Sequence, residues 1–166
     1  MRPHKHNNMR EVKFRAYDNK LRKYVDTGEI IFSFYGDTRV QVMPNEINYG
    51  QIADYEHDIN NGRFIIEQYT GLKDANGVEI YEGDSILVHQ FLFEGMEVEK
   101  EFKGNVVYIE DVACFGVKVT EQMDNLFLNY TGYDTLEEME AFCFSSLYGL
   151  HEESFKVIGN IHETQT

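Results

Sequence analysis

Apolar and polar residues alternate along much of the chain, and this pattern predicts a fold built mainly of β-strands. In residues 10–17 the apolar Val12, Phe14 and Ala16 alternate with polar or aromatic neighbours, which is typical of a strand with one buried face. Roughly eight strands are expected in total. The other strand segments are residues 20–25, 30–43 (a hairpin), 64–70, 85–88, 102–110, 112–119 and 155–163.

Short turn signals connect these segments. Asp18-Asn19 and Gly36-Asp37 are expected to close two N-terminal hairpins. Asn76-Gly77 predicts a type I′ hairpin turn, which needs positive φ at both central residues. Glu82-Gly83-Asp84 predicts a second tight turn, in which the Asp84 carboxylate accepts nearby backbone N–H groups. The residues of this turn signature, which we interpret as architectural, are Gly71, Asp74, Asn76, Gly77, Gly83 and Asp84.

Two segments depart from the alternating pattern. Residues 44–63 are polar and rich in Asn, Asp and Gly, and they predict a long loop. Residues 135–148 predict one amphipathic helix, because Thr135 and Glu138 match a capping box and apolar residues follow at helical spacing. Those apolar residues are Leu136, Met139, Cys143 and Leu147, with Gly149 as the C-terminal stop.

Four blocks of the sequence resemble the YopX family of phage and prophage proteins. The longest block, residues 68–88, combines both turns with an apolar strand and is specific enough to make chance similarity a poor explanation. The chain departs from the family pattern at residues 93–104 and 120–150. The blocks are "MREVKFRAYD" from Met9, "QYTGLKDANGVEIYEGDSILV" from Gln68, "GNVVYIEDVACFGVK" from Gly104 and "FKVIGNIHE" from Phe155.

The resemblance implies a β-rich fold that contains a small barrel, and it supplies no catalytic or ligand residues. Together with the strand pattern, it predicts an SH3-like or similar small barrel with added hairpins. We expect residues 1–8 to be an N-terminal extension and residues 9–166 to be a single domain, with hairpins and the polar loop at 9–63 and the barrel core at 64–166. Strands 10–17 and 155–162 are expected to share a sheet.

Sequence motifs for catalysis or cofactor binding are missing. The chain has no GxSxG motif, phosphate loop or dinucleotide fingerprint, and its six histidines have no zinc-site spacing. Cys114 and Cys143 are too few for a disulfide scaffold and are expected to be buried, reduced thiols. We therefore expect a cytoplasmic, non-enzymatic protein of the bacterial host without metal or cofactor. No apolar run reaches the eighteen residues of a membrane span.

Charge is divided unevenly between a basic N-terminal arm and an acidic body. The net charge is -14, but residues 1–23 hold eight basic and two acidic side chains, so that the remainder carries -20. This division indicates charged partners. The expected partner is a second copy of the chain or a basic host or phage protein; the alternative is nucleic acid bound by the arm, since the body would repel phosphates. The candidate arm residues are Arg10, Lys13, Arg15, Arg22 and Lys23.

Overall fold

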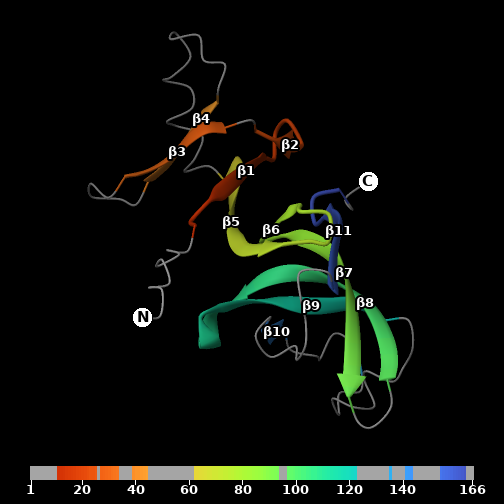
Figure 1. Cartoon of the computed structure of the whole chain (residues 1–166). Helices are drawn as coiled ribbons and strands as arrows, with labels where there is room; N and C mark the ends of the chain where they lie inside the picture. The colour runs from red at the N-terminus through yellow and green to blue at the C-terminus, as the bar shows by residue number, and fades with distance from the viewer. Residues whose placement is uncertain are drawn as a thin grey trace, which may run out of the picture.

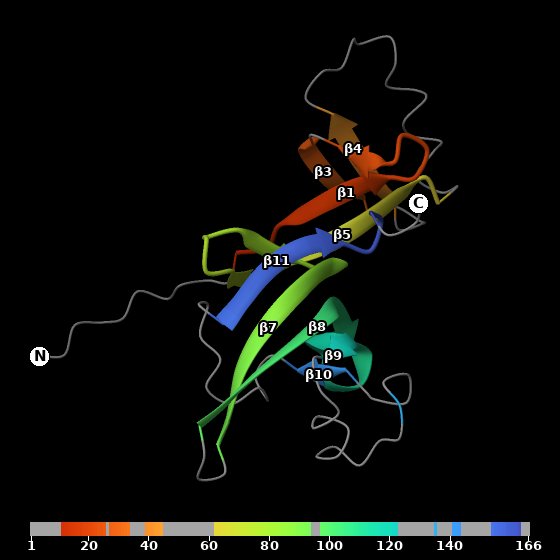
Figure 2. The ribbon, with the colours of Figure 1, turned by 90° about the vertical axis from the view of Figure 1, so that its right-hand side faces the viewer.

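The computed structural model describes residues 11–25, 27–33, 39–44, 62–93, 97–122, 135, 141–143 and 154–163. These residues form a mainly β protein with antiparallel sheets (Figure 1). The N-terminal and C-terminal halves contribute to different sheets, and β11 crosses close to both of them (Figure 2).

Strands of the described residues form three sheets. A four-stranded sheet has the order β2-β1-β5-β6, a five-stranded sheet has the order β10-β9-β8-β7-β11, and β3 and β4 form a separate hairpin. The strands are β1 (Phe14–Asp18), β2 (Lys23–Tyr24), β3 (Thr27–Ser33), β4 (Arg39–Pro44), β5 (Phe64–Lys73), β6 (Glu79–Tyr81), β7 (Asp84–Phe93), β8 (Glu97–Ile109), β9 (Cys114–Gln122), β10 (Phe142–Cys143) and β11 (Phe155–Asn160).

The five-stranded sheet is curled (Figure 1). Its strands β7, β8, β9 and β11 supply most of the main hydrophobic core. Alternate residues of its long strands point inward, as the period of two requires, and Val88 lies opposite Phe102 in the β7–β8 register. Gly104 allows β8 and β9 to approach closely, because a Cβ there would lie 2.4 Å from a methyl carbon of Val117. The buried members of the core are Ile80, Ile86, Val88, Phe102, Val106, Val117, Val119 and Phe155.

The mainly β fold expected from the sequence is confirmed, and the curled sheet forms a half-barrel. Its strand order ends at β10 on one side and β11 on the other, so no pairing among the described residues closes it. Strand β1 lies in the other sheet, paired with β5 and β2. The expectation that residues 10–17 and 155–162 share a sheet is therefore wrong, because β11 finds its partner in β7 instead.

The helix expected at residues 135–148 is wrong where the structure describes the segment. Phe142 and Cys143 form β10, which pairs with Val117 and Gly116 of β9. Apolar residues at helical spacing can also serve as a short edge strand, and the unpaired edge of β9 supplies the backbone hydrogen bonds that decide the outcome here. Among the described residues there is no α-helix; a 3₁₀ turn, Glu110–Val112, connects β8 and β9.

The oxidation state of Cys114 also differs from the expectation. It opens β9 and is disulfide-bonded, so the reduced thiol predicted at this position is wrong. The sequence contains two cysteines, and the pairing of β10 with β9 brings the backbone of Cys143 beside Gly116. The two cysteines are far apart in the sequence, and only the strand pairing brings their backbones near one another.

The turn at Asn76-Gly77 is not type I′. Positive φ occurs at Gly77 (+80°) but not at Asn76, and the Gly77 N–H donates to Asp74 O at 2.9 Å. This geometry is that of a three-residue loop, a type I turn followed by a left-handed residue. The Gly83 turn is confirmed, with φ of +80°. Residues 1–8, Gly36-Asp37 and most of the 44–63 loop lie outside the described residues.

Candidate functional site

A buried network of charged side chains joins the two larger sheets. At its centre is Arg15 on β1, whose Nε donates to Glu67 Oε2 on β5 at 2.7 Å and whose Nη2 donates to Asp84 Oδ1 on β7 at 2.5 Å. The side chains of Glu67 and Asp84 are only 3% and 2% exposed. Because buried charges are costly unless they are paired, this double ion pair links β1 and β5 to the curled sheet.

Aromatic rings enclose the guanidinium group of Arg15. Its central carbon lies 4.3 Å from the ring centroid of Tyr24 and 4.6 Å from that of Tyr81, which is within cation–π range. The Tyr24 hydroxyl donates to Glu67 Oε2 at 3.0 Å. Burial raises the pKa of Tyr24 and raises the pKa of Tyr81 to about 12. Both hydroxyl groups therefore stay neutral near pH 7 and act as hydrogen-bond donors.

The C-terminal turn completes the network. His162 Nε2 lies 2.8 Å from Glu67 Oε1, and its ring stacks on Tyr17 with centroids 3.8 Å apart and planes 7° from parallel. The Ile161 N–H donates to Gly83 O at 2.9 Å. Gly83 is required here for space as well as for its φ, because a Cβ would lie 2.4 Å from Glu67 Oε1.

Asp18 organises the turn between β1 and β2. Its Oδ1 accepts the N–H groups of Lys20 and Leu21 at 2.8 and 3.0 Å, and its Oδ2 lies 2.8 Å from Arg63 Nη2. Burial would raise the pKa of Asp18, but these donors outweigh it and the pKa is lowered. The turn ends at Arg22, whose N–H donates to Asp18 O at 2.7 Å and whose φ is +53°.

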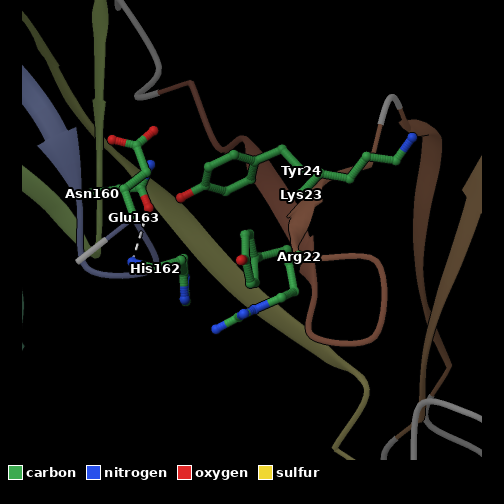
Figure 3. Close-up of a pocket in the computed structure, with 7 residues that line it drawn as sticks. Arg22, Lys23, Tyr24, Asn160, His162 and Glu163 are labelled. Carbon is green, nitrogen blue, oxygen red and sulfur yellow. Dashed lines mark hydrogen bonds between the residues drawn. The ribbon is translucent and has the colours of Figure 1, made fainter. Parts of the chain in front are cut away.

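Two adjoining hollows lie between this turn and the C-terminal turn, with volumes of about 400 and 330 Å³. Figure 3 shows that Arg22 and Tyr24 reach toward the side of the C-terminal turn, while the ammonium group of Lys23 is directed outward. Tyr17, Arg22 and His162 line both hollows; the first is completed by Lys23, Tyr24, Asn160 and Glu163, and the second by Asn19, Ile65 and Ile161.

The structure describes four of the five candidate arm cations and places them in different surroundings. Lys13 Nζ lies 2.6 Å from Glu79 Oε1, and Arg15 is committed to the buried carboxylates. Arg22 and Lys23 are exposed at the larger hollow, and Arg10 lies outside the described residues. Lys13 and Arg15 are thus paired with carboxylates of the acidic body.

The turn signature has an architectural role at each position where the structure gives contacts. Gly71, Gly77 and Gly83 all have positive φ. Asp74 Oδ1 accepts the N–H groups of Asn76 and Val78, and its Oδ2 accepts the N–H group of Val157 on β11. Asp84 adds the expected bond from the Tyr81 N–H at 2.8 Å. These contacts fix the β5–β6 and β6–β7 connections and attach β11 to them.

Sequence reasoning did not find Glu67 and His162, although both contact the centre of the network. Glu67 is a lone carboxylate within the apolar strand "FIIEQYT", and a charged residue in such a strand is a signal for a buried ion pair. His162 gave no comparable signal, because its partner Glu67 lies 95 residues earlier. Within the described ranges, no group of three or more His, Cys, Asp or Glu residues is placed to hold a metal ion.

No membrane-spanning helix occurs in the described part of the chain. The search of curated proteins found no match. Among solved structures, the crystal structure of protein EF1440 from Enterococcus faecalis is similar to this chain, with 20% sequence identity and a TM-score of 0.45, over 93% of this chain and 96% of that one. The family model described as "YopX protein" matches residues 13–166. The chain therefore belongs to the YopX protein family.

Proposed function

We propose that this YopX protein is a non-enzymatic phage or prophage accessory protein that acts in the host cytoplasm through protein–protein contacts, including contacts between its own copies. The observation that carries this proposal is the mutual pairing within the buried network. Arg15, Glu67, Asp84 and Tyr24 are engaged with one another, and His162 contacts Glu67. Such a network is suited to holding two sheets together rather than to transferring protons or attacking a substrate.

The surface around the hollows supports binding of a polypeptide. Leu21, Ile65 and Ile161 are exposed apolar side chains, and Arg22 and Lys23 add exposed cations to the same region. Arginine beside aromatic and aliphatic side chains is a typical composition for residues that dominate protein interfaces. The strongly acidic remainder of the chain would speed association with basic surfaces and make it dependent on salt.

Nucleic-acid binding is the rival function, and the exposed Arg22 and Lys23 are the observation in its favour. Single-stranded nucleic acid is held by cations together with open aromatic faces on which bases stack. Tyr17 is only 8% exposed, and the His162 side chain only 7%, so their stacked rings offer little surface to a base. Lys13 and Arg15 are also engaged with carboxylates. These contacts favour protein partners.

Affinity capture from host lysate, with and without nuclease, tests the proposal. We expect a protein partner, or a second copy of the chain, to be retained after nuclease treatment. Recovery that disappears with nuclease, and that is lost when Arg22 and Lys23 are changed to Gln, would transfer the function to nucleic acid. Replacement of the exposed Lys73 and Lys156 by Gln is the matched control, because it removes the same charge away from the hollows.

A further inference from the structure

Strand β10 makes a very short pairing with the edge of β9. It consists of two residues, Phe142 and Cys143, which lie opposite Val117 and Gly116 in the register. On the other side of β9, the pairing with β8 extends over eight residue pairs. Ordering the backbone of a residue costs about as much free energy as the hydrogen bonds of so short a pairing return. The pairing of β10 with β9 therefore needs a further attachment in order to persist.

A disulfide bond supplies this attachment. Cys114 opens β9 and is disulfide-bonded, and Cys143 is the other cysteine of the chain. The bond therefore joins the two strands at a point two residues along β9 from Gly116, which Cys143 opposes. It closes a loop over residues 115–142, and a crosslink of this kind restricts the conformations that the separated strands can adopt. One covalent bond thus holds β10 in place.

Strand β10 covers part of an edge that would otherwise be open. Strand β9 lies between β8 and β10 in the sheet order, as Figure 2 also shows. Phe115, Val117 and Val119 of β9 are buried apolar residues. A strand edge with unpaired N–H and C=O groups is a template for pairing with other chains. The attachment of β10 therefore determines how much of this apolar strand presents a free edge.

The disulfide lies near the surface, where a thiol reductant has access to it. Cys114 is half-buried and closely follows the 3₁₀ turn Glu110–Val112, in which Val112 is 63% exposed. The rate of thiol–disulfide exchange depends on such access. In a reducing cytoplasm, where the proposed function places the protein, disulfides are rare and those that form are usually transient or redox-sensing.

We propose that the disulfide between Cys114 and Cys143 is a redox latch, which holds β10 on the edge of β9 when oxidised and releases it when reduced. A thiolate of the reductant, glutathione or a dithiol protein, attacks one sulfur, so that the S–S bond breaks and a mixed disulfide forms. A second thiolate of the reductant then displaces the chain. Two electrons pass to the chain, whose two thiolates take up the protons lost by the reductant, and the reductant leaves as its own disulfide. The latch adds regulation to the proposed function and takes only the reducing compartment from it.

Hydrogen exchange of the full-length chain, followed by mass spectrometry, tests the latch. The oxidised protein is compared with the same protein reduced by glutathione, in peptides that cover β9 and β10. Reduction should speed exchange of the amides in β10, and of those in residues 115–117 that face it, by about tenfold or more, because their pairing gives way to local opening. Peptides that cover β7, which pairs with β8 on the far side of the sheet, should be unchanged.

Cys114→Ser combined with Cys143→Ser is the matched variant, because it removes the bond without a reductant. It should exchange like the reduced chain both with and without glutathione, which separates loss of the bond from any other effect of glutathione. Circular dichroism and the urea midpoint establish that the variant is folded, and the reduced unmodified chain provides the same comparison without a substitution.

Three results would overturn the latch. Exchange in β9 and β10 that does not change on reduction would mean that β10 needs no covalent attachment. Loss of protection throughout β7 and β8 as well would make the bond a staple of the whole fold. A bond that survives excess reduced glutathione, measured by thiol alkylation, would lie beyond the reach of the host's reductants. None of these results bears on the proposed function, whose test is the capture of a partner, and failure of that capture leaves these measurements unaffected.

Discussion

Replacement of Arg15 by Ala should destabilise the protein more than loss of any exposed ion pair. The substitution removes the guanidinium group from between Glu67 and Asp84 and leaves both carboxylates in a site where their side chains are almost inaccessible. It also removes the cation from between the rings of Tyr24 and Tyr81. The two sheets would then lose the ion pairs that join β1 to β5 and β7.

The expected loss in the free energy of unfolding is about 3–5 kcal/mol, which is the range for breaking a buried ion pair by removing one partner. Since small proteins are stable by roughly 5–15 kcal/mol, this would remove a large part of the total. Arg15→Lys keeps the charge but loses the planar fork that reaches both carboxylates. We expect it to cost less, about 1–3 kcal/mol, the range for hydrogen bonds to charged groups.

Urea unfolding, followed by far-UV circular dichroism or by tyrosine fluorescence, measures these differences by linear extrapolation. Tyrosine is the useful intrinsic fluorophore because the chain has 11 Tyr and no Trp. The matched control is Lys103→Ala, which breaks an exposed ion pair whose Lys103 Nζ and Glu121 Oε2 atoms lie 2.8 Å apart. Exposed pairs contribute about 0–1 kcal/mol, so this control should be close to the unmodified protein.

A loss for Arg15→Ala no larger than that for Lys103→Ala would refute the reasoning, because it would mean that the buried carboxylates do not need their cation. A second variant separates charge from packing. Arg15→Met combined with Glu67→Gln and Asp84→Asn leaves no buried charge unpaired, and we expect it to be more stable than Arg15→Ala alone. If it were less stable, lost packing rather than unpaired charge would explain the effect.

Three further predictions follow from the turns and carboxylates of the described residues. Gly83→Ala should cost more stability than Gly71→Ala. Both substitutions place a side chain at a positive φ, which costs about 1–2 kcal/mol. Only at Gly83 would the new Cβ also lie 2.4 Å from Glu67 Oε1. Asp74→Ala should cost about 2–3 kcal/mol, because three backbone N–H groups lose their acceptor. Thermal stability should fall as the pH drops below about 3.8, because the pKa values of Asp18 and Asp74 are lowered from that value in the folded state. The stability that these two carboxylates add is fully present above their unfolded pKa. It is lost as the pH falls through their folded pKa.

Each of these predictions has a measurement that can contradict it. Equal urea midpoints for the two glycine variants would mean that Glu67 moves aside at no cost. For Asp74, the control is Asn76→Ala, which leaves all three N–H groups paired; similar losses in both variants would show that the carboxylate is not the organising group. Melting temperatures for Asp18→Asn and the unmodified chain should converge in acid, and parallel curves would contradict the lowered pKa.

The alternation of apolar and polar residues determined most of the strands. Three strands were expected at nearly their observed places: Phe14–Asp18, Phe64–Lys73 and Phe155–Asn160. Strict alternation of apolar and polar residues indicates a β-strand with one buried face. Gly83 and Asp84 were also assigned correctly, since a turn that needs positive φ or a side-chain acceptor is specified within a few residues. The family resemblance in four blocks is likewise a property of the sequence alone.

Tertiary structure decided which strands became neighbours and which charges met. Apolar residues at helical spacing around Phe142 and Cys143 form a strand, because the free edge of β9 pairs with them. Lys13 and Arg15 belong to the basic segment that the sequence offered as a nucleic-acid arm. In the structure, Glu79 binds Lys13, and Glu67 and Asp84 bind Arg15. These carboxylates lie 66, 52 and 69 residues away from their cations along the chain. His162 lies 95 residues from Glu67. A local pattern records what each residue can do, and only the packing of distant strands determines which partner it receives.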